Sequence, residues 1–465
     1  MNGEIEFTCI KCQHHFTKDA VYKETGIVQC PDCLKVFIWN NWNYFRREWL
    51  EIICNALIIL IIFKANLFDQ YVIPTSSMEP TLHGANHFPE DGGDKVLVNK
   101  FYYKLYEPKN WDVVVFNPPH INQLFIKRLI GLPNQKVQII NGDIYINNLI
   151  NRKPENVESE LLYTLYDSSL DSGPLEHFSE FKDRAAWLSM NQRWQIEPNL
   201  LTIDGGSGHL KFNYPIDDRI SSHKLTNIQK KGAFKTNGVN PELQNLKING
   251  GYDGSFNLVG DIAIDFEFVI KSNAGTFSCE IIENNNRFKC LFEDNGRRLK
   301  LLKNESVVKE LEVNLIMGRS YQISFQNVDD RLKVSIDGKA LEYNFKSSDH
   351  GSKTTNSGLY FYCNNFSVSI KNIRIRRDVF YFCENVRYAR YDQGQITFDL
   401  KDDQYFFLGD NVHQSADSRS WGFVKRNMIK GKAMYVLWPI RIWPGSDLPP
   451  KLPFVSHRTR SKKIN

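Results

Sequence analysis

The stretch Ile262-Ala-Ile-Asp-Phe-Glu-Phe-Val-Ile270 decides the fold class of this chain, because apolar side chains recur at every second position. A period of two is typical of a β-strand that buries one face. The same alternation recurs at 321–325, 332–336, 366–370 and 373–375, with Gly and Asn turns between the runs. Several short strands at this spacing predict a mainly β protein with a jelly-roll β-sandwich at about 250–378.

This region forms the second part of a longer segment, 151–378, whose composition differs from the sequence on either side. Its first part is polar and irregular, and Asp204-Gly-Gly-Ser-Gly208 is typical of a loop. The second part resembles laminin-G or concanavalin-like modules, including the closing run Val368-Ser-Ile-Lys-Asn-Ile-Arg-Ile375. That resemblance implies a glycan or protein ligand for the insertion, although many such modules are spacers and fold alone does not decide function.

Length and composition limit the classes of protein. A chain of 465 residues has room for roughly three domains. With 42% hydrophobic and 24% charged residues, the composition is globular. The mean hydropathy of −0.41 excludes a polytopic membrane protein but leaves room for one span. The 58 basic and 53 acidic residues nearly balance, so we expect no nucleic-acid partner.

The longest apolar stretch runs from Trp49 to Phe63. Its densest part is short of the roughly 20 residues that cross a bilayer, but flanking aromatic and apolar residues extend it. We therefore expect one uncleaved transmembrane helix at about 47–66; a buried core helix is the alternative. A cleaved signal peptide fits poorly, because no small-x-small site follows. Arg46 and Arg47 precede the stretch, which predicts a cytoplasmic N-terminus, with the residues after 68 on the outer side of the cell membrane.

The first 40 residues contain two C-x2-C pairs, Cys9 with Cys12 and Cys30 with Cys33. This spacing predicts a zinc ribbon, in which each turn directs two thiolates to one structural Zn²⁺. A redox role for either pair is the alternative, but it needs a βαβ context that is absent. His14 and His15 are surplus to a four-cysteine site and are expected on the surface. The four cysteines beyond residue 278 allow three disulfide pairings, which the sequence leaves open: Cys279, Cys290, Cys363 and Cys383.

Four strings outside the insertion carry residues suited to catalysis. They are Ile73-Pro-Thr-Ser-Ser-Met-Glu-Pro-Thr-Leu82, Gly93-Asp-Lys-Val-Leu-Val-Asn-Lys100, Phe125-Ile-Lys-Arg-Leu-Ile-Gly-Leu-Pro133 and Gly409-Asp-Asn-Val-His-Gln-Ser-Ala-Asp-Ser-Arg-Ser-Trp-Gly422. A serine hydroxyl needs a base, and a lysine in apolar surroundings can supply one because burial disfavours its charged form. Lys127 lies among Ile126, Leu129 and Ile130, whereas the histidines lie in polar, loop-like stretches.

This ordered set closely resembles the type I signal peptidase family, over about 69–148 and 380–440. The resemblance implies a membrane-bound Ser–Lys hydrolase with a signal-peptidase-type β fold and no catalytic cofactor. Its substrates would be secretory preproteins with small-x-small sites, and its other partner would be the lipid bilayer. Val412 and Asn134-Gln135 depart from the family pattern, at positions that carry no catalytic group.

The resemblance also assigns roles to individual residues. Ser77 would be the nucleophile and Lys127 the general base; Ser76 is a rival nucleophile that does not match the motif. Among the supporting residues, Thr75 would form the oxyanion hole with the Ser77 N–H, and Ser415 would orient Lys127. Asp417 and Arg419 would form an ion pair. Asp410 and Asn411 would hold the loop that presents Ser415.

The predicted domain order follows from these assignments. It is a zinc ribbon at 1–40, a juxtamembrane and transmembrane segment at 41–68, a first peptidase part at 69–150, the insertion at 151–378, and a second peptidase part with a basic tail at 379–465. Two other classes remain open. One is a membrane-anchored binding protein that displays the sandwich on a non-catalytic peptidase fold, and the other is a self-cleaving Ser–Lys regulator.

Overall fold

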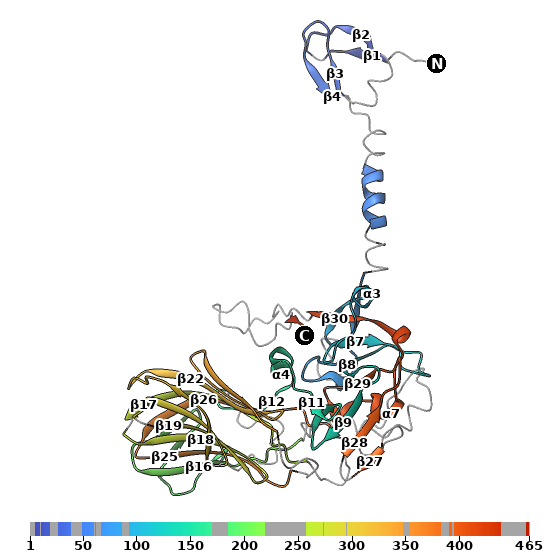
Figure 1. Ribbon diagram of the computed structural model, residues 1–465. Coiled ribbons are helices and arrows are strands. Elements are labelled where there is room, and N and C mark those ends of the chain that lie inside the picture. Colours follow the sequence, from blue (N-terminus) through green and yellow to red (C-terminus); the bar gives the residue numbers. More distant parts are fainter. Residues whose placement is uncertain are drawn as a thin grey trace. The chain divides into compact units, whose positions relative to one another are not determined.

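Antiparallel β-strands make up most of the described chain, as the alternating sequence predicted (Figure 1). The computed structural model describes residues 5–9, 11–18, 27–38, 49–59, 61, 67–85, 93–169, 185–218, 257–272, 274–293, 295–346, 354–382, 390–392, 395–438 and 462–464. The chain divides into two units, Met1–Asp69 and Gln70–Asn465.

The N-terminal unit begins with two short hairpins. Strand β1 (Ile5–Thr8) pairs with β2 (His15–Lys18), and β3 (Ile27–Gln29) pairs with β4 (Val36–Ile38). Each pair of cysteines lies in the turn of one hairpin, where Gln13 N–H donates to the Cys9 carbonyl and Leu34 N–H to that of Cys30. The repeated turn explains why the two C-x2-C pairs converge.

Residues 49–59 form a helix, with Ile61 also helical. Its large apolar side chains are exposed, between 47% for Ile53 and 67% for Ile59. Within the described ranges, the structure contains no helix that is both long enough and apolar enough to cross a membrane. Residues 47, 48, 60 and 62–66 of the predicted span lie outside those ranges.

Two sheets form the part of the second unit that flanks the insertion, here called the flanking domain (residues 70–162 and 378–464). The larger sheet has the order β29 (Phe406–Leu408), β8 (Phe125–Gly131), β7 (Val113–Phe116), β30 (Ile429–Trp438), β6 (Lys95–Asn99), β5 (Phe68–Val72), with β31 (Lys462–Lys463) beside β30. The other sheet has the order β11 (Leu149–Ile150), β10 (Asp143–Ile146), β9 (Lys136–Ile140), β28 (Gln395–Asp399), β27 (Arg390–Asp392). Strands from the two sides of the insertion pair directly, β29 with β8 and β28 with β9, so the split halves build one domain.

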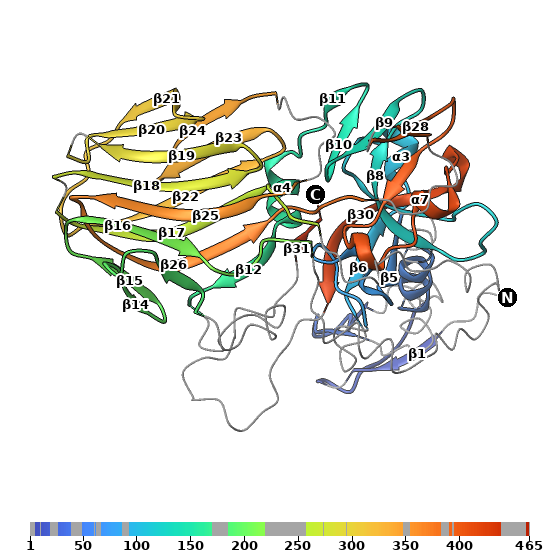
Figure 2. The ribbon, with the colours of Figure 1, turned by 90° about the horizontal axis from the view of Figure 1, so that it is seen from below.

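The insertion is a β-sandwich of two large sheets, whose strands run across the view in Figure 2. One sheet has the order β14 (Gln195–Glu197), β15 (Leu200–Ile203), β26 (Ser367–Arg377), β17 (Ile262–Ser272), β22 (Ser320–Val328), β23 (Arg331–Ile336), β24 (Lys339–Asn344), with β12 (Tyr163–Asp167) also on β26. The other has the order β13 (Trp187–Ser189), β16 (Ser207–Phe212), β25 (Ser357–Asn364), β18 (Thr276–Glu283), β19 (Asn286–Glu293), β20 (Arg298–Lys303), β21 (Ser306–Glu312).

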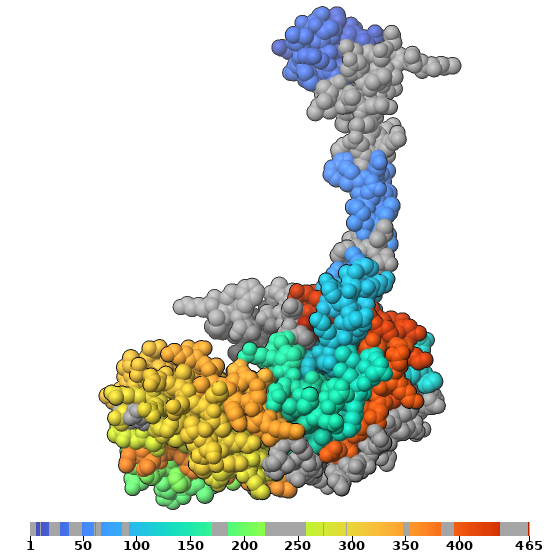
Figure 3. Space-filling model, in the orientation of Figure 1, coloured from blue at the N-terminus to red at the C-terminus, as the bar shows by residue number. Residues whose placement is uncertain are grey.

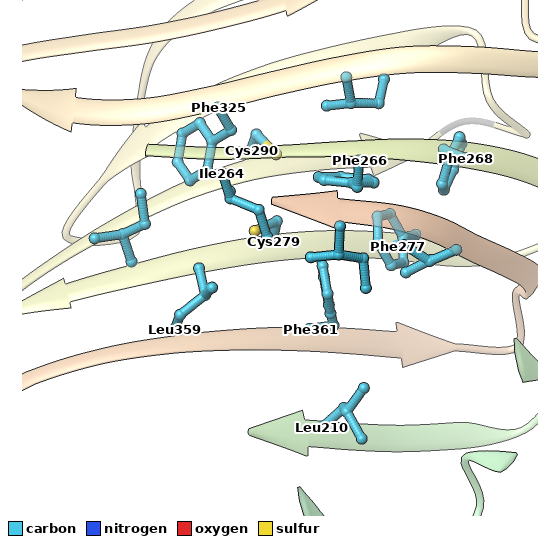
Figure 4. Packing of buried hydrophobic residues seen from close by; sticks show 14 of the residues in the cluster. Leu210, Ile264, Phe266, Phe268, Phe277, Cys279, Cys290, Phe325, Leu359 and Phe361 are labelled. Atoms are coloured by element: carbon cyan, nitrogen blue, oxygen red, sulfur yellow. The ribbon is translucent and has the colours of Figure 1, made fainter. Parts of the chain in front are cut away.

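Aromatic side chains fill the space between the two sheets (Figure 4). Phe266 and Phe268 of β17 meet Phe277 of β18 and Phe361 of β25, and all four are fully buried. The predicted alternation at 262–270 is therefore confirmed. Burying a phenylalanine stabilises the fold by roughly 1.5–3 kcal/mol, which makes this core large enough to hold a domain together.

The sandwich begins earlier than the expected start near residue 250. Strands β12 to β16 extend both sheets from Tyr163 onwards, so the segment predicted to be irregular contributes to the same core. Cys279 and Cys290 are cross-strand neighbours in this core, and both are free thiols, as is Cys363. Cys383 lies outside the described residues.

Helix α4 (Glu155–Leu161) joins the flanking domain to the sandwich (Figures 1 and 2). Val157 and Leu161 pack into the core of the flanking domain. On the sandwich side, Glu158 accepts a 2.6 Å hydrogen bond from Gln326 and forms an ion pair with Arg331. The surfaces of the two parts meet in Figure 3, where the sandwich is yellow and orange.

Candidate active site

A buried contact between Ser77 and Lys127 forms the centre of the site. Ser77 lies in the 3-10 helix η1 (Ser76–Met78), a few residues after strand β5 ends, and Lys127 lies in β8. The Lys127 ammonium Nζ is 2.5 Å from the Ser77 hydroxyl Oγ. Only 5% of Ser77 and 3% of Lys127 are exposed. The two residues that the sequence singled out, 50 positions apart, are therefore in hydrogen-bond contact.

The surroundings of Lys127 favour its neutral form. Burial lowers the pKa of Lys127 to about 8, and this effect outweighs the opposing influence of Asp417 and Asp410. Lys127 lies opposite Val114 of β7, with the Phe125 ring 5.7 Å from its ammonium. A lysine with this pKa is neutral in a substantial fraction of molecules near neutral pH, which a base requires.

The neighbouring cation, Arg128, has the opposite environment. It points to the other side of β8 and makes two hydrogen bonds of 2.9 Å, through Nε and Nη2, to the carboxylate of Asp410. Arg128 also donates to the hydroxyl of Thr81 (3.0 Å) and to the carbonyl of Trp111 (2.9 Å). A bidentate pair of this kind is geometrically specific. It therefore anchors the loop that follows β29 to β8.

That loop holds the backbone of the serine segment. Asn411 N–H donates to the Ser77 carbonyl at 3.1 Å, and the Asn411 side-chain amide donates to the Ser76 carbonyl at 2.9 Å. Ser76 is thus engaged through its backbone. Asn411 thus fastens this loop to the segment that carries Ser77, while Asp410 fastens it to Arg128 in β8. The role of both residues in presenting Ser415 stays a prediction.

Asp417 and Arg419 form the expected ion pair at the start of helix α7 (Ser418–Trp421). Their side chains approach to 2.7 Å, and both residues are almost fully buried. Asp417 also accepts from the Gly409 N–H at 3.0 Å, while Arg419 donates to the carbonyls of Val412 and Phe382. The pair connects α7 to both ends of the loop that carries Asn411.

Of the two hydroxyl residues predicted to assist catalysis, Thr75 lies beside Ser77, whereas Ser415 is placed differently from the expectation. The Thr75 hydroxyl donates to Ser77 Oγ at 3.3 Å. The Ser415 hydroxyl is buried and has no hydrogen-bond partner among the described residues, so the expected bond to Lys127 is not formed. The physical reason is position: Ser415 Oγ lies against Gly409, on the same side as the Ser77 carbonyl oxygen.

Sequence reasoning gave no role to several residues that shape the site. A Cβ on Gly409 would lie 2.1 Å from Ser415 Oγ and 2.6 Å from the Ser77 carbonyl oxygen. A Cβ on Gly84 would lie 2.2 Å from the Thr75 carbonyl carbon. The Tyr163 hydroxyl donates to the Glu79 carbonyl at 2.5 Å. Arg128 and both glycines stand within or beside the quoted motifs, but their contacts are long-range and leave no periodic signal.

The arrangement is equipped for acyl transfer. A hydroxyl in contact with a buried amine of lowered pKa can be deprotonated as it attacks a carbonyl, and the amine can then return the proton to the leaving group. Three hydrogen bonds, two from Asn411 and one from Tyr163, hold the serine segment in place. This keeps the reacting atoms in register. Lys127, in hydrogen-bond contact with Ser77, is the base that the geometry offers.

The four N-terminal cysteines come together as the spacing predicted. Their Sγ atoms all lie within 4.8 Å of one another. Cys9 and Cys33 approach to 3.5 Å, and Cys12 and Cys30 to 3.6 Å, across the two hairpins. The backbone N–H of Cys12 is the main cause that lowers the pKa of Cys9 to about 6. Four convergent sulfurs fit a tetrahedral Zn²⁺.

The chain matches known sequences over much of the flanking domain and over parts of the sequence beyond it. A sequence model of the family described as "Signal peptidase, peptidase S26" matches residues 46–180 and 325–438, more than half of the chain. The chain is 34% identical over 111 residues to the probable signal peptidase I-2 of Synechocystis sp., covering 22% of this chain and 47% of that protein. It is also 34% identical over 133 residues to signal peptidase I of Rickettsia bellii, covering 26% and 45%. The chain spans about half the length of these curated relatives.

Solved structures resemble this chain only distantly. A carbohydrate-binding module, CBM66 from Bacillus subtilis, is 11% identical with a TM-score of 0.27, covering 41% of this chain and 94% of that chain. A protein of unknown function with a galectin-like fold from Bacillus subtilis is 12% identical with a TM-score of 0.29, covering 47% and 97%. The architecture of the sandwich rests on its own strand pairing.

Proposed function

Since this chain belongs to the signal peptidase family, peptidase S26, we propose that it is a membrane-bound serine endopeptidase that removes N-terminal signal peptides from exported preproteins. The observation that carries the proposal is the 2.5 Å contact between Ser77 Oγ and Lys127 Nζ in a buried setting. The named signal peptidases among its relatives support the substrate class.

The reaction proceeds in two proton-coupled stages. Neutral Lys127 takes the proton of Ser77 as Oγ attacks the scissile carbonyl, and Lys127 then donates this proton to the departing amine. Water, activated by the neutral lysine, releases the acyl group from Ser77 in the second stage. Thr75 stands close enough to Ser77, at 3.3 Å, to turn toward the oxyanion that develops on the substrate.

The substrate binds as an extended strand. Strand β5 is the end strand of the larger sheet, and Ser77 follows it by a few residues. Backbone pairing between a peptide and the edge of a sheet accepts many sequences. Small side chains at the cleavage site then provide the specificity. The family resemblance supports this small-x-small preference.

A membrane helix brings enzyme and substrate together. The helix at 49–59 exposes its apolar side chains on every side, which is unfavourable in water and typical of a helix in lipid. Arg46 and Arg47 precede it, so the N-terminal hairpins face the cytoplasm and the second unit lies on the outer side. The four-cysteine cluster binds a structural Zn²⁺, and the sandwich binds a glycan or protein ligand at the outer surface.

The test compares two adjacent serines. Ser77→Ala should abolish cleavage of a preprotein in detergent micelles, whereas Ser76→Ala should retain most of the activity, because Ser76 is held through its backbone carbonyl. Thermal unfolding should be nearly unchanged in both variants. If Ser77→Ala cleaved the preprotein as fast as the wild-type protein does, the mechanism would be rejected. Absence of cleavage by the folded wild-type protein would favour the alternative, a binding protein on a non-catalytic fold.

A further inference from the structure

Four aspartates converge where the sandwich joins the flanking domain. Asp143 begins strand β10, Asp261 immediately precedes β17, Asp329 immediately follows β22, and Asp378 immediately follows β26. One carboxylate oxygen of each lies within 4.8 Å of the others. We call these residues the acidic junction. One comes from the flanking domain before the insertion, and the others lie at the ends of sandwich strands.

The acidic junction carries more negative charge than its lysine balances. Lys153 Nζ is 2.5 Å from Asp329 and 2.6 Å from Asp378, and all three side chains are buried. Lys153 is also the cation that acts on Asp143, where the nearby carboxylates of Asp329, Glu283 and Asp330 oppose it. Burying like charges without compensation is costly, so this excess needs a counterion or protons.

A second observation points to a ligand. Asp378 is only 1% exposed, yet its second oxygen, Oδ1, has no hydrogen-bond partner among the described residues. Beside the cluster is a cavity of about 10 Å³, lined in part by Asp143, Asp261 and Val379, the residue after Asp378. A cavity of this size holds one water-sized particle. Glu283 lines the same cavity and adds another carboxylate to its wall.

The acid–base behaviour agrees with this geometry. Burial raises the pKa of Asp143 and of Asp261 well above the ordinary range, and it raises the pKa of Asp378 to about 6. Neighbouring carboxylates contribute to these shifts in the same direction, while Lys153 opposes them at Asp143 and Asp378. A bound cation would remove this penalty and keep the carboxylates ionised.

We propose that the acidic junction binds one divalent cation of the calcium type, which fastens the sandwich to the flanking domain. The donors are carboxylate oxygens without nitrogen or sulfur, a set that hard cations prefer, and several strand ends can adapt to the variable geometry of Ca²⁺ better than to the strict octahedron of Mg²⁺. Asp143 and Asp261 face the cavity, and Asp378 supplies its unused oxygen. Asp329 and Lys153 hold that carboxylate in place.

The site has a structural consequence that does not depend on the proposed peptidase activity. Asp143 follows Gly142, which forms a β-bridge to Tyr381 shortly after Asp378. Ligands on both sides of the junction would make rigid docking of the sandwich dependent on the cation. Binding energy that is available only in the docked state stabilises that state.

The experiment measures thermal unfolding of the full chain in EDTA, in CaCl₂ and in MgCl₂. Saturating Ca²⁺ should raise the Tm on the order of 5 °C above the EDTA value, and Mg²⁺ should raise it less. Asp143→Asn should abolish the shift. In EDTA this variant should be at least as stable as the wild type, because a neutral amide relieves the repulsion. That result would separate loss of the site from a failure to fold.

Asp204→Asn is the matched control, since Asp204 is exposed on the sandwich and forms a 3.3 Å surface contact with Lys271. It should keep the full Ca²⁺ shift. An equal shift in Asp143→Asn, or none in the wild type, would overturn the proposal. If acidification in EDTA raised the Tm while Ca²⁺ did not, the junction would hold protons instead of a cation, and the proposal would be wrong.

Discussion

Two adjacent basic residues in strand β8, Lys127 and Arg128, have pKa shifts in opposite directions. Lys127 points to Ser77 and has no carboxylate in hydrogen-bond contact, so burial lowers its pKa to about 8. Burial alone would also lower the pKa of Arg128, but the paired Asp410 raises it, and this guanidinium stays charged. The strand thereby supplies a neutral amine to one face and a permanent cation to the other. The base, Lys127, and the residue that anchors the loop, Arg128, are therefore direct neighbours in the sequence.

Lys127→Arg tests whether the amine must lose its proton. Arginine preserves the charge and much of the length, but its guanidinium cannot be deprotonated usefully. We expect turnover to fall at least about 10³-fold, as in Ser77→Ala, and the double variant to be no worse than either single variant, because the pair acts as a unit. Steady-state kinetics with a signal-peptide substrate measure this. If the fold losses of turnover in the two single variants multiplied in the double variant, the two residues would not act together.

Gly409 and Ser415 provide a second test at the residue scale. A Cβ on Gly409 would clash with Ser415 Oγ and with the Ser77 carbonyl, so Gly409→Ala should displace the nucleophile and lower kcat strongly, at a stability cost of about 1–3 kcal/mol. Ser415→Ala removes a hydroxyl that makes no hydrogen bond and should retain most of the activity. Kinetics and thermal unfolding of both variants provide the comparison. A larger loss in Ser415→Ala than in Gly409→Ala would contradict this placement of the loop.

At the scale of elements, the hairpins and the helix of the N-terminal unit have little core of their own. Two short hairpins bury few apolar side chains, so the fold of the module depends on its four convergent cysteines. We expect one zinc ion per chain, released on denaturation. Cys30→Ser should lose the zinc and make the first 40 residues sensitive to protease, while Lys11→Ala should not. Metal analysis of reduced wild-type protein that finds no zinc would refute the assignment.

Strand periodicity predicted the elements unevenly. The run at 262–270 alternates strictly and became β17, whereas β14 (Gln195–Glu197) is short and exposed at all three positions. A strand that buries no face leaves no period of two to detect. Strand β16 (Ser207–Phe212) does alternate, but its first residues belong to the loop-like run Asp204–Gly208, so the sandwich was expected to begin near 250. The turn at Asp337-Gly338, in contrast, has positive φ angles at both residues, as is common for Asp-Gly in a two-residue hairpin turn.

The site was predicted to a different extent from the fold. The motifs named Ser77, Lys127 and the Asp417–Arg419 pair, and the structure brings both pairs together. They could not give the position of Ser415, because that depends on a backbone approach at Gly409. The acidic junction was also missed, since its aspartates are spread from residue 143 to residue 378 and each follows the pattern of an ordinary strand end.

At the scale of the whole molecule, the insertion begins and ends at one place. Tyr163 of β12 and Arg377 of β26 are paired neighbours, so a short linker can replace the sandwich without stretching the flanking domain. We expect a variant with a short Gly/Ser linker in place of residues 163–377 to fold with a lower Tm. It should still cleave a short peptide, because Ser77 and Lys127 lie in the flanking domain.

The control for this deletion is the same linker variant carrying Ser77→Ala. It should fold equally well and show no cleavage. A folded deletion protein that has lost all activity would show that the sandwich helps to build the site. The hydrogen bond from Tyr163 to the Glu79 carbonyl is the contact through which that could happen.

The central claim is that neutral Lys127 is the base for Ser77, and the pH dependence of kcat/KM tests it most directly. The active form is the deprotonated amine, so kcat/KM should rise about tenfold per pH unit below the pKa and level off above it. With the pKa of Lys127 lowered to about 8 by burial, the midpoint should lie near that value. The measurement is kcat/KM for a fluorescent signal-peptide substrate from about pH 6 to about pH 10. A midpoint near 8 that disappears with the activity in Lys127→Arg is the predicted result. A profile with its midpoint near 6.5, as for a histidine base, or one unchanged in Lys127→Arg, would contradict the account.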